Sequence, residues 1–242
     1  MKKFILLITV LLSAKIFALS ASEILKKVDY NMTPSTIKYD GKMIIHQGKQ
    51  TLTKEMKVIA DGAETALIEF TSPARDKGTK FLRTENNLYI FFPSAGKTQK
   101  LSGHMLRQGM MGSDISYEDQ TSRNKLNDSY NSKVISENDN EYVLELISKP
   151  NEENTYYKRV LTIDKKNFVL KNSLMYANSG KLLKELTVVD YKKIGDRFYI
   201  TNFKMIDKVK KDSYTEIISS NIEVDIKIDS SIFTLSNLEK RN

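Results

Sequence analysis

The 242-residue sequence has no cysteine and no tryptophan, and only four prolines. Without cysteine there can be no disulfide bonds and no lipid-modified cysteine of a bacterial lipoprotein, and few candidate ligands remain for zinc. A chain of roughly 220 residues can still bury one sizeable core without such cross-links. No linker rich in Gly, Ser or Pro divides the chain, so we expect a single domain over residues 21–242.

Long apolar runs are also scarce, and the clearest one stands at the N-terminus. The sequence "MKK" precedes the apolar run "FILLITVLLSA", and small residues follow at Ala18, Ser20 and Ala21. This order is typical of a secretory signal peptide, and the run is too short for a permanent membrane span. We therefore expect a signal peptide over residues 1–20, cleaved between Ala18 and Ala21, and a periplasmic location. The alternative is a buried N-terminal helix.

The positive charge of the chain is modest and dispersed. The formal net charge is +8, and removal of Lys2, Lys3 and Lys15 with the signal peptide lowers it by three to +5. No block of Lys and Arg resembles a basic arm that binds nucleic acid. We expect no nucleic-acid partner.

The apolar periodicity changes once along the chain. "ASEILKKVDYNM" (21–32) has helical spacing, with Ser22 as a candidate cap, and Pro34 ends it. Beyond it, apolar and polar residues alternate with period two in segment after segment, which predicts an antiparallel meander of about ten or eleven strands. "SYEDQTSRNKL" (116–126) and "SSIFTLSNLEK" (230–240) are candidate short helices. The fold class is mainly β (α+β), and the sheet must curl or be covered to bury its apolar face.

One insertion interrupts this pattern at residues 103–126. Its first part, "GHMLRQGMMGSDISYEDQ", contains Met105, Leu106, Met110 and Met111 between glycines that can act as hinges. Methionine is flexible and adapts to varied apolar shapes. The segment is therefore either a movable lid over an apolar cavity or a plug that never leaves the core.

Candidate catalytic groups are few. His46 and His104 have no partner at metal-ligand spacing. Asp114, Glu118 and Asp119 could form an acid/base pair or a calcium loop, but helix capping and a solvated face are the favoured interpretation. Nucleophile-elbow, phosphate-loop and dinucleotide motifs are absent from the sequence. We predict no catalytic residues, no metal site, no cofactor and no enzyme activity.

Four stretches carry a family resemblance. They are "ASEILKKVDYNM", "FTSPARDKGTKFL", "NNLYIFFPSAGKTQKLSG" and "MMGSDISYEDQ". In this order they resemble the outer-membrane lipoprotein-sorting family, the relatives of the periplasmic carrier LolA, in the branch associated with resistance-nodulation-division exporters. The resemblance implies an incomplete, strongly curved β-barrel whose short helices form a lid over an apolar concave face. It also implies a critical Arg near the lid, for which Arg75, Arg83 and Arg107 are candidates.

The resemblance and the alternation together predict an apolar cavity that binds acyl chains of lipoproteins or lipids. The predicted lining is Tyr39, Met43, Ile45, Ile68, Phe70, Ile90, Phe92, Met105, Leu106, Met110 and Met111. The leading hypothesis is a monomeric periplasmic carrier between membranes, with an inner-membrane transporter and an outer-membrane acceptor as partners.

Two other classes of function stay open. The first is a non-catalytic interaction module of an envelope or efflux complex, which would use the open edge of the sheet. The second is an enzyme acting on lipids or cell-wall polymers, for which Asp114, Glu118, Asp119 and His104 are the candidate groups.

Overall fold

A computed structural model describes residues 19–85, 87–121, 125–150, 152 and 154–240 of the protein. The predicted signal peptide, apart from Leu19 and Ser20, lies outside the described residues. No helix in the described ranges is long and apolar enough to span a bilayer.

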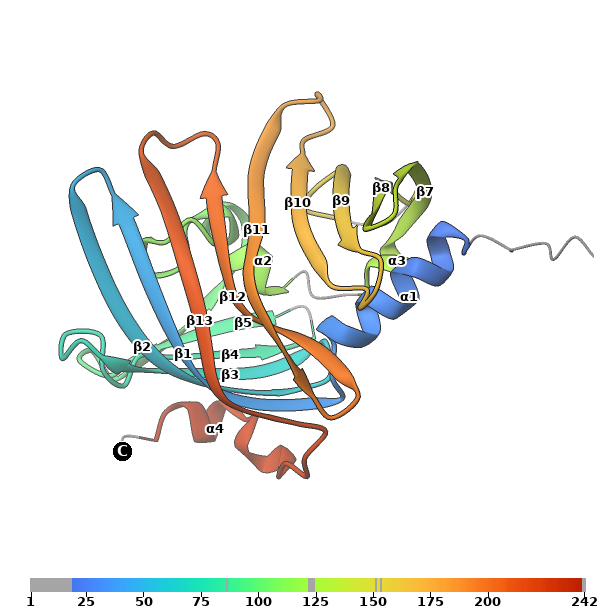
Figure 1. The fold of residues 1–242 in the computed structure, drawn as a ribbon. Coiled ribbons are helices and arrows are strands. Elements are labelled where there is room, and N and C mark those ends of the chain that lie inside the picture. Colours follow the sequence, from blue (N-terminus) through green and yellow to red (C-terminus); the bar gives the residue numbers. More distant parts are fainter. Residues whose placement is uncertain (1–18, 86, 122–124, 151, 153, 241–242) are drawn as a thin grey trace, which may run out of the picture.

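The fold is one antiparallel sheet of thirteen strands, in the order β6-β5-β4-β3-β2-β1-β13-β12-β11-β10-β9-β8-β7. The strands are β1 (Thr36–Gln47), β2 (Gln50–Asp61), β3 (Thr65–Ser72), β4 (Lys80–Thr84), β5 (Asn87–Phe92), β6 (Lys97–Leu101), β7 (Tyr130–Glu137), β8 (Glu141–Ser148), β9 (Lys158–Asp164), β10 (Leu170–Tyr176), β11 (Leu182–Ile194), β12 (Arg197–Asp207) and β13 (Ser213–Val224). The sheet curves strongly without closing (Figure 1), so the predicted fold class is confirmed.

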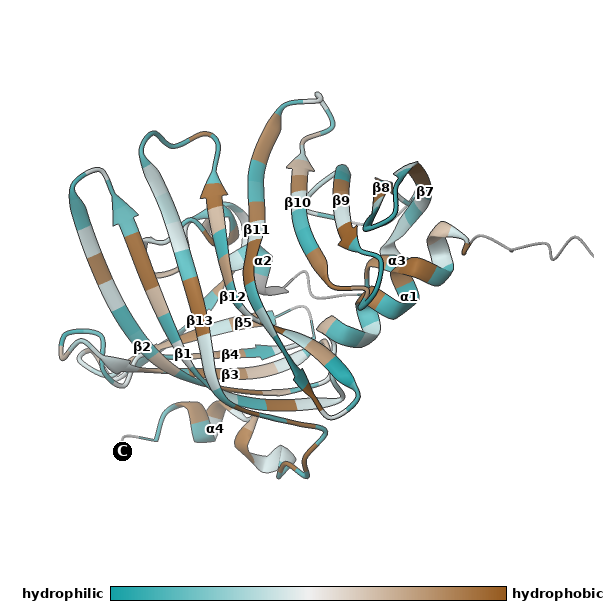
Figure 2. Ribbon diagram, viewed as in Figure 1, coloured by the Kyte–Doolittle hydropathy of each residue, from teal (hydrophilic) through white to brown (hydrophobic). Residues whose placement is uncertain are grey.

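The sheet has more strands than the ten or eleven expected. The alternation missed β4, which is buried along most of its length, and the largely polar edge strands β6 and β7. Polar side chains are a common protection of exposed sheet edges, and they remove the apolar signal that marks inner strands. In the longer strands the alternation is plain, as the bands of opposite hydropathy along β1 and β2 show (Figure 2).

Short helices complete the structure. They are α1 (Ala21–Met32), η1 (Gly103–Arg107), η2 (Met110–Gly112), α2 (Tyr117–Thr121), α3 (Leu126–Ser129), η3 (Ser230–Ile232) and α4 (Leu235–Leu238). Because β6 and β7 are the two edge strands, the chain that joins them crosses the opening of the incomplete barrel. We call residues 103–121 of this connection the lid. Helix α4 packs on the outer side, beneath β4 (Figure 1).

Helix α1 spans the predicted residues, but its cap differs from the prediction. Ser20, one residue before the helix, forms a capping box with Glu23, whereas Ser22 lies inside the first turn and donates to Asn127 at 2.7 Å. The cap is set by the residue at which the helix begins, and the periodicity locates that residue only to within a turn.

Two apolar clusters lie on the concave side of the sheet. One joins the lid to β1–β5 and includes Met43, Phe70, Phe81 and Met110. The other joins α1 to the strands β7–β10 and includes Leu25, Leu144 and Leu161. The concave face is thus covered in two halves by different segments, and the space between those halves is where a cavity can form.

Candidate functional site: an apolar cavity beneath the lid

A cavity of about 260 Å³ lies between the lid, the end of α1 and the concave face of the sheet. Four residues of the predicted lining reach its wall, namely Tyr39, Met43, Ile68 and Met110. The rest of the apolar wall comes mainly from the second half of the chain, with Leu161, Leu170, Met175, Leu186, Phe203, Met205 and Ile217. The period-two alternation of the later strands was the signal that could have identified these residues.

The other predicted lining residues lie away from the cavity wall. Ile45, Phe70 and Ile90 are buried in the adjoining cluster, against which Met105, Leu106 and Met111 pack from the lid. Phe92 stands at the end of β5 with 38% of its surface exposed and outside this cluster. The predicted set therefore describes the lid half of the concave face, and the cavity lies nearer to β9–β13.

The cavity exists because small residues stand on the concave face. Ser173 on β10 and Ser219 on β13 both line it. Gly41 is paired with Ser219 across β1 and β13, and it alternates with Tyr39 and Met43. A larger side chain at Ser173 or Ser219 would project toward the space that the cavity occupies, whereas a Cβ atom at Gly41 would lie 2.9 Å from the Met56 side chain.

The lid folds into a tight loop that directs two apolar side chains into the cavity. The Met110 amide donates to the Ile115 carbonyl at 2.7 Å, and the Tyr117 amide donates to the Gln108 carbonyl at 3.0 Å. Met110 and Ile115 are 2% and 4% exposed and line the cavity. The lid thus covers one side of the cavity with its own apolar residues.

Gly109 is required at the start of this loop. A Cβ atom at Gly109 would lie 2.1 Å from the carbonyl oxygen of Ser113, a backbone atom that cannot rotate away. Gly109→Ala is expected to lower the free energy of unfolding by ~1–3 kcal/mol and to speed proteolysis within the lid. In Gly48→Ala the Cβ atom meets open space and strain comes only from the positive φ of 56°, so this control should leave proteolysis of the lid unchanged. Equal lid proteolysis in the two variants would contradict the tight-loop geometry.

Asp114 anchors the lid to the β12–β13 end of the sheet. Its carboxylate is 1% exposed and accepts hydrogen bonds from Ser213 at 2.8 Å and Thr215 at 2.8 Å. Lys210 lies 3.3 Å from the same carboxylate and donates to the Ser113 carbonyl at 2.9 Å. The expectation of a solvated or capping carboxylate is wrong for Asp114, because the β12–β13 turn supplies a charge partner that the sequence does not reveal.

Asp119 forms the second anchor, in α2. It accepts from Ser116 in a capping arrangement, and also from Lys184 of β11 at 2.5 Å and from Tyr156. Burial by itself would raise the pKa of the Asp119 carboxyl, but the Lys184 ammonium and the Tyr156 hydroxyl hold that pKa below its usual range. Burial and the adjacent negative charge raise the pKa of the Tyr156 hydroxyl, so Tyr156 stays protonated as the donor. The capping interpretation holds for Asp119, but the solvated one does not.

The remaining candidate residues fall in different places. Arg83 is 3% exposed and borders a small void beside Met110, whereas Arg75 and Arg107 are exposed. Arg83 is therefore the candidate that lies against the lid.

His104 is exposed, and the described residues contain no group of three or more His, Asp or Glu side chains that could hold a metal ion.

A family model described as "Uncharacterized protein" matches residues 62–240, which is well over half of the chain. The chain belongs to this family. No curated protein sequence matches the chain significantly.

Three crystal structures share the fold over nearly the whole chain. A DUF1329 family protein from Desulfovibrio piger has a TM-score of 0.81 at 22% identity, covering 90% of this chain and 97% of that one. An outer membrane lipoprotein-sorting protein domain from Vibrio parahaemolyticus has a TM-score of 0.79 at 20% identity, covering 91% and 98%. A LolA superfamily protein from Nitrosomonas europaea has a TM-score of 0.75 at 24% identity, covering 90% and 99%. The predicted resemblance is confirmed at the level of the fold.

Proposed function

We propose that the protein is a non-enzymatic, monomeric periplasmic carrier that holds acyl chains of lipids or lipoproteins between its lid and its sheet. The observation that carries this proposal is the apolar cavity of about 260 Å³ that Met110 and Ile115 of the lid help to line. An interaction module needs no such space, because it could use a filled interior. The outer membrane lipoprotein-sorting protein domain from Vibrio parahaemolyticus has the same fold, and this structural similarity supports the proposal.

The size of the cavity suggests how a chain would enter. Its volume of about 260 Å³ is slightly below the ~300–1,000 Å³ of pockets that enclose small ligands. A long acyl chain therefore needs more room, which the lid can provide if Met110 and Ile115 withdraw. Methionine side chains can repack around a guest at low cost.

Energetics explain why the carrier needs partners. Each buried methylene contributes ~0.8 kcal/mol, so a long chain gains on the order of 10 kcal/mol on leaving water. A membrane offers a similar gain, so extraction requires an external driving force. In the proposal an inner-membrane transporter supplies that force. Unloading at an outer-membrane acceptor follows as the lid residues return to the cavity.

A cavity-filling substitution tests the proposal. Ser219→Phe places a ring in the cavity wall and is expected to weaken binding of a fluorescent long-chain fatty acid by about tenfold or more, since each displaced methylene contact is worth ~0.8 kcal/mol. Titration of the purified protein, followed by fluorescence, measures this affinity.

Ser220→Phe is the matched control, because Ser220 is the exposed neighbour on the same strand. It adds the same side chain outside the cavity and should bind the probe like the wild type. Failure of the wild type to bind the probe, or equal binding by the two variants, would count against an acyl-chain cavity.

A further inference from the structure

Arg159 places a positive charge at the wall of the apolar cavity. It stands on β9 and lines the cavity together with Leu161 of the same strand. Its Nε donates to the Tyr130 hydroxyl at 3.3 Å, and its guanidinium lies 5.0 Å from the centre of the Tyr156 ring. These contacts hold the guanidinium in place.

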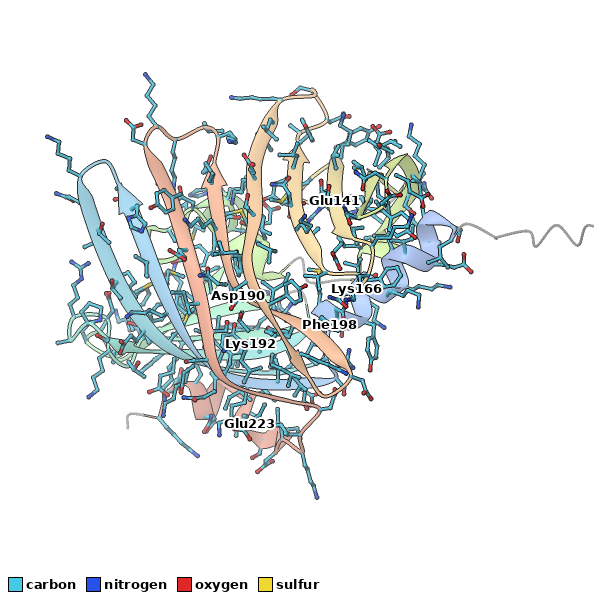
Figure 3. The ribbon with its side chains drawn as sticks, viewed as in Figure 1. Glu141, Lys166, Asp190, Lys192, Phe198 and Glu223 are labelled. Carbon is cyan, nitrogen blue, oxygen red and sulfur yellow. The ribbon has the colours of Figure 1, made fainter. Side chains whose placement is uncertain are left out.

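Arg159 has no acidic partner within the described residues, since none of their ion pairs includes it. By contrast, Glu141 pairs with Lys171, and Glu223 lies 3.5 Å from Lys38. Figure 3 labels these two glutamates. Arg159 is half-buried, and a partly desolvated cation is stabilised by an opposite charge. The cavity therefore presents an unused site for an anion.

The two carboxylates that line the same cavity already accept hydrogen bonds from other protein groups. The oxygens of Asp119 accept from Tyr156 and from Lys184. The oxygens of Asp29 accept from the backbone amides of Leu126 at 3.0 Å and Asn127 at 2.9 Å. Both acids thus hold the lid and α3 in place, and neither forms an ion pair with Arg159 within the described residues.

Ser173 supplies a second, independent sign of a polar ligand. Ser173 lines the cavity and is 2% exposed, and its Oγ atom is buried without a hydrogen-bond partner. Ser173 is paired with Leu161 and Met175 is paired with Arg159, so Ser173 and Arg159 are diagonal neighbours about 7–8 Å apart on the same face. A buried hydroxyl without a partner is unfavourable until a ligand atom occupies the position beside it.

We propose that the cavity binds an anionic amphiphile, whose carboxylate or phosphate oxygens contact Arg159 and whose next polar group reaches Ser173. The planar guanidinium can donate two parallel hydrogen bonds to such an anion. The apolar tail lies along the adjoining wall. This inference rests on the proposed carrier function and narrows its cargo: acyl groups held only as esters or amides carry no charge, so Arg159 favours fatty acids or phosphate-bearing lipids over the acyl groups of a lipoprotein.

Paired ligands test this inference. Wild-type protein is titrated with palmitate, with methyl palmitate and with palmitoyl lysophosphatidate, and Arg159→Gln is titrated with the same three. The wild type should bind an anionic ligand more tightly than the methyl ester. Arg159→Gln should lose about tenfold or more in affinity for the anion and less than about threefold for the ester. The tighter of palmitate and lysophosphatidate identifies the carboxylate or the phosphate as the preferred group.

Selectivity is the informative readout, because a merely destabilised variant would weaken all three ligands alike. Arg159→Lys keeps the charge and should keep the preference for anions, and Arg107→Gln, on the exposed side of the lid, should behave like the wild type. Ser173→Ala, which leaves Arg159 and its aromatic contacts in place, should weaken anion binding by about threefold or more. Equal binding of palmitate, lysophosphatidate and methyl palmitate by the wild type overturns the inference but leaves the carrier function intact. Binding of none of the three overturns both.

Discussion

Met110→Asp is expected to abolish acyl-chain binding and to lower the free energy of unfolding by ~3–5 kcal/mol, the usual cost of an uncompensated buried charge. Met110 is 2% exposed and belongs to the cluster that joins the lid to β1–β5. Arg83 borders the small void beside Met110 but already has a partner of its own. A carboxylate at position 110 must therefore either stay desolvated among mainly apolar side chains or draw the lid out into water. Urea denaturation measures the loss of stability, and limited proteolysis of residues 103–121 reports whether the lid has opened.

Two controls separate the effect of a charge buried beneath the lid from the effect of any change at residue 110 and from the effect of a charge at an exposed site. Met110→Leu conserves volume and should cost less than ~1.5 kcal/mol, with lid proteolysis unchanged. Val209→Asp introduces the same charge at a residue that is 60% exposed, so stability should change by less than ~0.5 kcal/mol. A protected lid in Met110→Asp, with fatty-acid binding retained, would show that Met110 does not close the cavity.

Asp119→Asn should destabilise the protein by ~3 kcal/mol or more at neutral pH. The substitution removes the negative charge that pairs with Lys184, and the two side chains are each only 10% exposed. The Lys184 ammonium would then be buried without a counter-charge. Adding Lys184→Met to this variant should recover part of the loss, because the double variant buries no lone charge. A change of less than ~0.5 kcal/mol in Asp119→Asn would contradict the role of this ion pair in seating the lid.

The Asp119 carboxyl also predicts that the wild-type protein loses stability at acidic pH. The pKa of Asp119 lies below its ordinary value of 3.8 when the protein is folded, despite burial, because of Lys184 and Tyr156. The charged form therefore stabilises the fold above pH 3.8, and this contribution is lost as the pH falls from there through the lower folded pKa. Urea denaturation between neutral and acidic pH should show a smaller loss of stability in Asp119→Asn than in the wild type. Parallel pH profiles would contradict the lowered pKa.

Local patterns predicted the elements of this fold well. The range of α1 follows from helical spacing that ends before Pro34, and β1 follows from alternation around Met43. These signals are contained in short windows of sequence, so no knowledge of neighbouring strands is needed. The strand count was less accurate because β6 and β7 are polar edges.

The cavity could not be located from the same windows. The position of the cavity depends on the register of strand pairing. Gly41 lies opposite Ser219 only because β1 pairs with β13, and Ser173 lies diagonal to Arg159 only because β9 pairs with β10. The burial of Asp114 likewise depends on Lys210, which is 96 residues away in the sequence. The alternation within β9–β13 marks which of their residues face inward, but it does not show that those residues share a cavity with the lid. The predicted lining therefore captured the lid half of the concave face and missed the half around Arg159.

Native mass spectrometry of the protein purified from bacterial periplasm, before and after organic extraction, most directly tests whether the cavity holds acyl chains. We expect a fraction of the protein to carry extra mass that extraction removes and that lipid analysis identifies as an acyl-containing amphiphile. That mass should be missing from Ser219→Phe and present in Ser220→Phe. A wild-type protein that carries no lipid from the periplasm and takes up none from added fatty acid would contradict the carrier function.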